Sequence, residues 1–242
     1  MSSYERYPSQ AAWGAAGAGL ASFNDALRRH MLRIYNMMML GLAVTGLVAA
    51  VVASTPAIYV PIFTTPLKWV VMLAPLGFVM VLSWRFEQMS ASGVEALFWA
   101  FSAVMGLSMA SIFLVFTGTS IARVFFITAA MFAGTSLYGY VTKADLSKMG
   151  SFLVMGLIGM VIASLVNIFI GSTMIQFMVS AVGVLVFTGL TAYDTQRIRD
   201  SFSENHAHET SRKLAVMGAL TLYLNFINLF QSLLHLMGQR EE

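Results

Sequence analysis

The chain has 242 residues, of which 58% are hydrophobic and only 10% are charged. A soluble domain usually carries about a quarter charged residues, so this composition excludes an ordinary soluble protein. With no cysteine, the chain can form neither a disulfide framework nor a thiolate metal site, and its net charge of +3 follows more simply from membrane topology than from nucleic acid binding.

The first 25 residues differ from the rest of the chain. Residues 1–22, MSSYERYPSQAAWGAAGAGLAS, lack the basic start and leucine-rich core of a secretory signal peptide. We expect residues 1–25 to form a flexible cytoplasmic tail rich in small residues. A single transmembrane domain is then expected over residues 26–242.

Seven apolar segments follow this tail, and each is long enough to cross a hydrocarbon core of roughly 30 Å as a helix. Continuous runs of this length select helices, because the strands of a membrane barrel would alternate over about 10 residues. The sequence therefore predicts an all-α polytopic membrane protein. The spans are expected over residues 31–53, 68–84, 94–116, 121–141, 151–170, 174–194 and 213–237. Between the first two, Pro56, Pro61 and Pro66 predict a loop.

Basic residues indicate the orientation, because cytoplasmic loops are enriched in Lys and Arg. With a cytoplasmic N-terminus, eleven of the 14 Lys and Arg residues fall on the inner side. The three on the outer side are Lys68, Arg123 and Arg240. Seven full spans would place the C-terminus outside. The last segment contains amides and a histidine, so a full crossing and a re-entrant path both stay open.

Ionisable residues at membrane depth are candidate functional residues. Asp194 stands where the sixth apolar segment ends, in LTAYDTQRIRD (190–200). It is either a titrating or ion-coordinating carboxylate inside the bundle, or a hydrated helix-end acid paired with Arg197. Arg85 ends the second segment, and it either reaches across to Asp194 or anchors its helix in the headgroup region.

The last apolar segment carries a polar stripe. Thr221, Asn225, Asn228, Ser232 and His235 follow one another at steps of 4, 3, 4 and 3 residues, so they share one face of a helix. Helices do not present such a face to lipid. We expect the stripe to make hydrogen bonds between helices or to line a pore or cavity. We do not assign the lone His235 as a metal ligand, and we expect no cofactor.

Two further patterns bear on metal binding and catalysis. ENHAHET (204–210) has two histidines but neither an H-E-x-x-H spacing nor a supporting cysteine, so we interpret it as a solvated loop. AYD suggests an intramembrane aspartyl protease, but that chemistry requires two positioned acids. The other aspartates, Asp25, Asp145 and Asp200, are expected at loops. We therefore do not expect an enzyme.

Four stretches together resemble the Bax inhibitor family, in its bacterial, YccA-like branch of the transmembrane Bax-inhibitor-motif proteins. They are TKADLSKMG (142–150), ASLVNIF (163–169), GLTAYDTQRIRD (189–200) and LYLNFINLF (222–230). The resemblance runs from the first span to the end of the chain. It implies a seven-helix bundle with the last helix central, located in the bacterial inner membrane, and a pH-sensitive calcium leak.

The resemblance also implies a latch. In studied members, two aspartates on the last two helices share a proton and close the pore, and an arginine near the end of the second helix interacts with them. Asp194 matches the first aspartate and Arg85 the arginine, but Asn225 stands where the second aspartate is expected. Two close carboxylates cannot both ionise easily, whereas an amide does not titrate. We predict that an Asp194–Asn225 contact persists and that pH switching is weakened or lost.

The resemblance leaves a second function open. YccA-like members resemble modulators of a membrane-bound, ATP-dependent protease that grips a flexible cytosolic tail, and residues 1–23 fit such a handle.

Calcium usually takes roughly 6 to 8 oxygen ligands, more than Asp194, Asn225 and Asn228 can offer. The sequence therefore favours a calcium permeation path over a calcium storage site.

Overall fold

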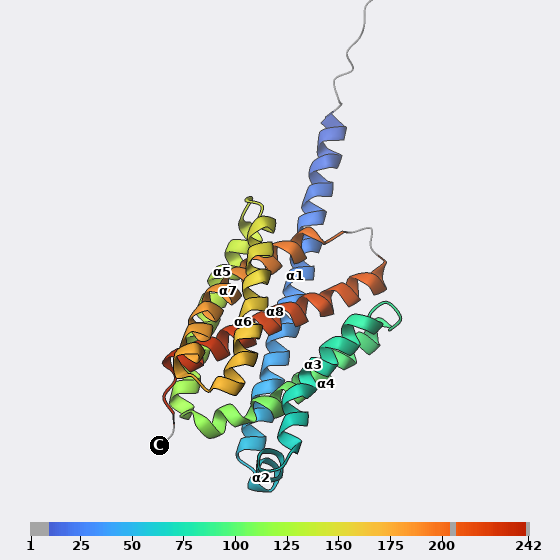
Figure 1. Ribbon diagram of the computed structural model, residues 1–242. Helices are drawn as coiled ribbons and strands as arrows, with labels where there is room; N and C mark the ends of the chain where they lie inside the picture. Colours follow the sequence, from blue (N-terminus) through green and yellow to red (C-terminus); the bar gives the residue numbers. More distant parts are fainter. Residues whose placement is uncertain (1–9, 204–206, 241–242) are drawn as a thin grey trace, which may run out of the picture.

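The computed structural model describes residues 10–203 and 207–240, and these form eight helices (Figure 1). They are α1 (Gln10–Ala53), α2 (Pro56–Thr64), α3 (Leu67–Arg85), α4 (Ala91–Val115), α5 (Gly118–Val141), α6 (Ser147–Ile170), α7 (Thr173–Asp200) and α8 (His208–Met237). Among the described helices, all except α2 are long and apolar enough to cross a membrane. The predicted all-α fold with seven spans is therefore confirmed.

The N-terminal region differs from the expectation. α1 begins at Gln10, so residues 10–25 are helical where a flexible tail was expected, and residues 1–9 of that tail lie outside the described residues. The predicted proline loop contains the short helix α2. Pro56 is accommodated in its first turn, where a missing backbone N–H costs nothing, and this lets a proline-rich connection stay helical.

The connection from α7 to α8 is also shorter than expected. α7 continues beyond the apolar segment to Asp200, and α8 begins at His208. The loop interpretation of residues 204–210 is therefore wrong for residues 208–210, while residues 204–206 lie outside the described part of the chain. Apolar content alone set both expected boundaries, but α7 ends beyond its apolar segment and α8 begins before its own.

The last helix is the centre of the bundle. Figure 1 shows α8 crossing the molecule obliquely, and it packs against α1, α4, α5 and α7. In the most apolar stretch of α8, 67% of the residues are buried, whereas 6 to 33% are buried in the corresponding stretches of the other six spans. α8 is one uninterrupted helix of 30 residues, so it does not follow the re-entrant path. The outer helices therefore shield α8 from lipid.

Buried hydroxyl groups connect α8 to its neighbours. The Thr45 hydroxyl on α1 lies 2.6 Å from the Tyr223 hydroxyl on α8 and 2.8 Å from the Ser102 carbonyl oxygen on α4. All three residues are buried. Because no water is available at this depth, partners of this kind are required for polar groups, and here they join three helices at one point.

A glycine lets α1 and α4 approach closely. A Cβ atom on Gly106 of α4 would lie 2.7 Å from the Thr45 carbonyl oxygen and 2.7 Å from Val48 Cβ on α1. A backbone carbonyl cannot move aside as the end of a flexible side chain can. The two helices therefore depend on the missing side chain for their spacing.

We predict that Gly106→Ala lowers the free energy of unfolding by about 1–3 kcal/mol, because the added methyl group overpacks the α1–α4 contact. Gly134→Ala on α5 is the control, since no atom lies within 4 Å of its Cβ position. That control should stabilise α5 by up to roughly 1 kcal/mol through helix propensity. The measurement is the melting temperature in detergent. Equal shifts in the two variants would refute the packing role of Gly106.

Candidate functional site

A hydrogen bond between α7 and α8 forms the centre of the candidate site. Asn225 Nδ2 donates to Asp194 Oδ2 at 2.7 Å. Both side chains are buried, with Asp194 8% exposed and Asn225 6%. The expected contact between these two residues is therefore present. An ionised acceptor makes such a bond stronger than one between neutral groups.

Asp194 is not a helix-end acid. α7 continues to Asp200, so Asp194 lies more than a turn inside the helix. Arg197, its expected partner on the surface, is exposed and makes no ion pair among the described residues. The interior position matches the first of the two interpretations of Asp194, the carboxylate that faces the bundle.

Arg85 does not take part in this contact. It is exposed at the end of α3, and among the described residues it makes no hydrogen bond or ion pair with Asp194. The physical reason is helix packing, because α3 packs chiefly against α4 and α2. The expectation that Arg85 reaches Asp194 is therefore not met. Its exposed place at a helix end matches the anchoring interpretation.

Three hydroxyl groups form what we call the hydroxyl chain, which ends at Thr195, the residue after Asp194. Tyr35 Oη on α1 lies 2.5 Å from Ser136 Oγ on α5, and Ser136 Oγ lies 2.9 Å from Thr195 Oγ1 on α7. The Thr195 hydroxyl also bonds the Thr191 carbonyl oxygen, 2.7 Å away. Sequence reasoning missed this chain, because uncharged residues more than 50 positions apart give no spacing signal.

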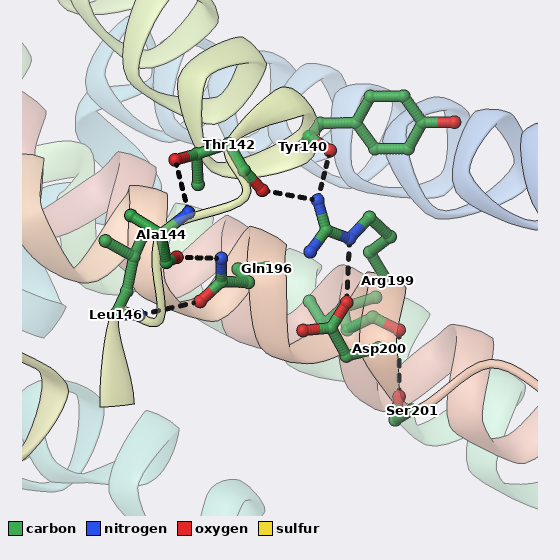
Figure 2. Close-up of polar contacts among 9 residues, drawn as sticks. Tyr140, Thr142, Ala144, Leu146, Gln196, Arg199, Asp200 and Ser201 are labelled. Atoms are coloured by element: carbon green, nitrogen blue, oxygen red, sulfur yellow. Dashed lines mark hydrogen bonds and ion pairs between the residues drawn. The ribbon is translucent and has the colours of Figure 1, made fainter. Parts of the chain in front are cut away.

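The residues after Asp194 hold the connection between α5 and α6 (Figure 2). Gln196 Nε2 donates to the Ala144 carbonyl at 2.8 Å, and its Oε1 accepts from the Leu146 N–H at 2.9 Å. Arg199 Nη1 donates to the Thr142 carbonyl at 3.1 Å and to the Tyr140 carbonyl. A cation at these carbonyls, at the end of α5, is favourable for the helix dipole. Side chains of residues 195–200 (TQRIRD) thus fix the end of α7 on which Asp194 lies.

The other aspartates lie apart from Asp194. Asp25 is exposed on α1 instead of in a loop, and Asp200 forms an ion pair with Arg199 at 2.7 Å. Asp145, between α5 and α6, accepts from the Ser147 N–H at 2.9 Å. Hydrogen bonds from Ser147 hold the pKa of the Asp145 carboxyl below its usual value. Among the described residues, none of the three bonds with Asp194.

The polar stripe of α8 has several different surroundings. Thr221 and Asn228 are half-buried and donate to carbonyls of their own helix, Met217 at 3.0 Å and Leu224 at 2.8 Å. Ser232 is buried where a Cβ on Gly183 of α7 would meet its Oγ at 2.5 Å. His235 is exposed, with Nδ1 2.8 Å from the Gln231 carbonyl oxygen. Within the described residues no group of three or more His, Asp and Glu could hold a metal ion.

Both ends of α8 are attached to the bundle. At the start, Arg212 Nη2 lies 3.0 Å from Glu95 Oε2 on α4, and Glu209 Oε1 accepts from the Ala91 N–H at 3.3 Å. Beyond the end, the Gln239 N–H donates to Ser120 Oγ on α5 at 2.9 Å. The Asp194–Asn225 contact thus lies in a helix that is held on both sides of it.

Comparison with known proteins identifies the family. The profile of the family described as "Inhibitor of apoptosis-promoting Bax1" matches residues 27–242. The chain belongs to the Bax inhibitor family. It is 44% identical over 217 residues to the inner membrane protein YbhL of Escherichia coli K12, covering 88% of this chain and 93% of YbhL. It is also 44% identical over 221 residues to an uncharacterized protein of Rickettsia prowazekii, covering 91% and 94% of the two chains.

The fold and the comparison indicate the same location for this Bax inhibitor family protein. Seven apolar helices and the similarity to an inner membrane protein support a multi-pass protein of the inner membrane. The match begins at residue 27, close to the boundary expected between tail and transmembrane domain. Asp194, Asn225 and the hydroxyl chain all lie within the matched region.

We predict that Gln196→Met loosens the α5–α6 connection, because it leaves the buried Leu146 N–H and the Ala144 carbonyl without their partner. Leaving the buried Leu146 N–H without its partner costs about 1–3 kcal/mol. Amide hydrogen exchange at residues 144–146 should accelerate by at least roughly fivefold, as that range of free energy implies. Gln176→Met on the same helix is the control, because no side-chain hydrogen bond is seen for Gln176 among the described residues. Unchanged exchange in Gln196→Met would contradict the prediction.

Proposed function

We propose that this Bax inhibitor family protein is a calcium leak channel in which the Asp194–Asn225 contact acts as a latch. The proposal rests on one observation, the buried hydrogen bond of 2.7 Å between α7 and the central helix α8. A carboxylate inside a membrane protein is expensive to bury, and such residues commonly mark ion pathways. We further propose that the N-terminus is cytoplasmic, as the distribution of Lys and Arg favours.

The strength of this contact suits a latch. A hydrogen bond to a charged group contributes roughly 1.5–3 kcal/mol, enough to bias two helices towards contact without locking them. When Asn225 moves away, the Asp194 oxygens become available to a cation. Calcium prefers oxygen ligands and needs roughly 6 to 8 of them for tight binding. One carboxylate with nearby amides and hydroxyls therefore suits passage of calcium better than storage.

Asn225 also shapes the response to pH. An amide carries no titrating proton, so the pair cannot share one as two carboxylates would. We therefore propose a leak that changes little between pH 6 and 8. The polar stripe residues Asn228 and Ser232 on α8 are the candidates to extend the pathway from the latch.

We predict that the native protein in liposomes carries calcium with a shallow dependence on pH between 6 and 8, and that Asn225→Asp makes this dependence steep. Asp194→Asn should reduce the flux, because it removes the only carboxylate of the contact. The measurement is calcium influx into liposomes loaded with a calcium-sensitive dye.

Asn36→Asp is the matched control, since Asn36 is exposed on α1 and makes no hydrogen bond with Asp194 among the described residues. It adds a carboxylate of the same kind outside the contact and should leave the pH dependence shallow. A steep switch near neutral pH in the native protein, or equal steepening by both new aspartates, would contradict the latch. Native flux that Asp194→Asn leaves unchanged would also contradict it.

A second proposed function is the modulation of a membrane-bound, ATP-dependent protease. It is favoured by the shape of α1, which starts at Gln10 although its membrane span begins at Phe23. Figure 1 shows this part of α1 projecting beyond the other helices. A projecting segment offers a protease a handle that the compact bundle lacks.

We predict that deletion of residues 2–22 separates the two proposed functions. The deletion ends before the span at Phe23, so calcium flux into liposomes should stay at the native level. Co-purification with a membrane-bound, ATP-dependent protease from the same membranes should be lost. Retained co-purification would exclude the handle, whereas lost flux would show that the segment serves the channel instead.

A further inference from the structure

A lateral groove opens between α1 and α5. α1 packs against α4 and α8, while α5 packs against α7 and α8. The two helices thus both pack against α8, and they meet each other through the hydrogen bond between Tyr35 and Ser136. Between them lies a groove of about 1,070 Å³, and the α8 residue Phe226 also lines it. This volume lies just above the range for small-molecule sites, which is roughly 300–1,000 Å³.

The groove runs along α1, one of the seven apolar spans, and is apolar over most of its length. Arg28 and Tyr140 line one end, and Leu47 and Phe125 line the other. From Arg28 to Leu47 α1 rises by roughly 28 Å at about 1.5 Å per residue. This length is close to the hydrocarbon thickness of a bilayer, roughly 30 Å. A ligand that fills the groove must therefore be long, apolar and aligned with the lipid chains.

The charge of the lining selects the headgroup of such a ligand. Arg28 is the one charged side chain among the described residues that line the groove, and it lies at an end. Arg29 and Arg33 on the same helix are exposed and add positive charge nearby. Clustered basic residues at a membrane surface attract anionic lipid headgroups. Among the described residues, no charged side chain lines the opposite end, at Leu47 and Phe125.

We propose that the lateral groove is a binding site for an anionic phospholipid, with its acyl chains between α1 and α5 and its phosphate at Arg28. Water is a poor occupant, because an apolar lining offers it too few hydrogen-bonding partners. A second protein helix would bury its own apolar face there, but it would not use the cation at the end. The site is independent of the proposed calcium flux.

The bound lipid would lie against the candidate functional site without forming part of it. Ser136 lines the groove and is the middle member of the hydroxyl chain, which continues to Thr195 beside Asp194. Phe226 follows Asn225 directly on α8. Asp194 and Asn225 themselves do not line the groove. The groove is thus a separate site whose lining includes Tyr35 and Ser136 of the hydroxyl chain together with Phe226.

The test is native mass spectrometry of the full chain purified in detergent, titrated with dioleoylphosphatidylglycerol or dioleoylphosphatidylcholine. One phosphatidylglycerol should bind per chain, with a preference of roughly fivefold over phosphatidylcholine, as expected for one basic residue at the headgroup. Ala133→Trp fills the groove and should weaken phosphatidylglycerol binding by roughly tenfold or more. Ala130→Trp is the matched control, an exposed alanine on the same helix that does not line the groove.

Arg28→Gln provides a second arm that does not depend on packing, because Arg28 is exposed. It should reduce the preference for phosphatidylglycerol to near unity while keeping lipid binding. Three results would overturn the proposal. They are equal binding of the two lipids to the native chain, equal loss of binding in Ala133→Trp and Ala130→Trp, and a lipid-free dimer as the main native species.

Discussion

The structure depends on the burial of one polar helix inside a membrane protein. α8 carries amides and hydroxyls, and 67% of its most apolar window is buried. In the hydrocarbon region each of these groups needs a partner within the protein. Asn225 finds Asp194, and Tyr223 finds Thr45. The outer helices pack around these contacts. The contacts that arrange the bundle are therefore the same contacts that form the site.

The sequence was sufficient for the fold because its strongest signal is apolar length. Seven long apolar segments leave few alternatives once backbone groups must be satisfied inside lipid. The same signal failed at helix ends. Gln196 and Arg199 are polar, yet they continue α7 because their partners are carbonyl and N–H groups of the α5–α6 connection. Such partners come from a distant part of the chain, which hydropathy cannot register.

The candidate site was predictable where a family motif and helical spacing agreed. Asp194 and Asn225 were both identified, and their contact is present at 2.7 Å. Arg85 was assigned only by its position after an aromatic helix end, and its side chain is exposed and makes no contact with Asp194 among the described residues. Tyr35 and Ser136 were missed altogether. A hydroxyl in an apolar helix is common, and only the packing of α1 on its neighbours makes these two adjacent.

The attachment of α8 at both ends constrains how it moves. Glu209 and Arg212 hold its first turns to α4, and Gln239 ties the residues after its last turn to Ser120 on α5. A helix fixed in this way cannot slide along its axis like a piston without breaking contacts at two distant places. The middle of α8 can separate from α7 at a lower cost in free energy if the helix bows or rotates about its axis. The Asp194–Asn225 contact lies near the middle, where such a movement has its greatest amplitude.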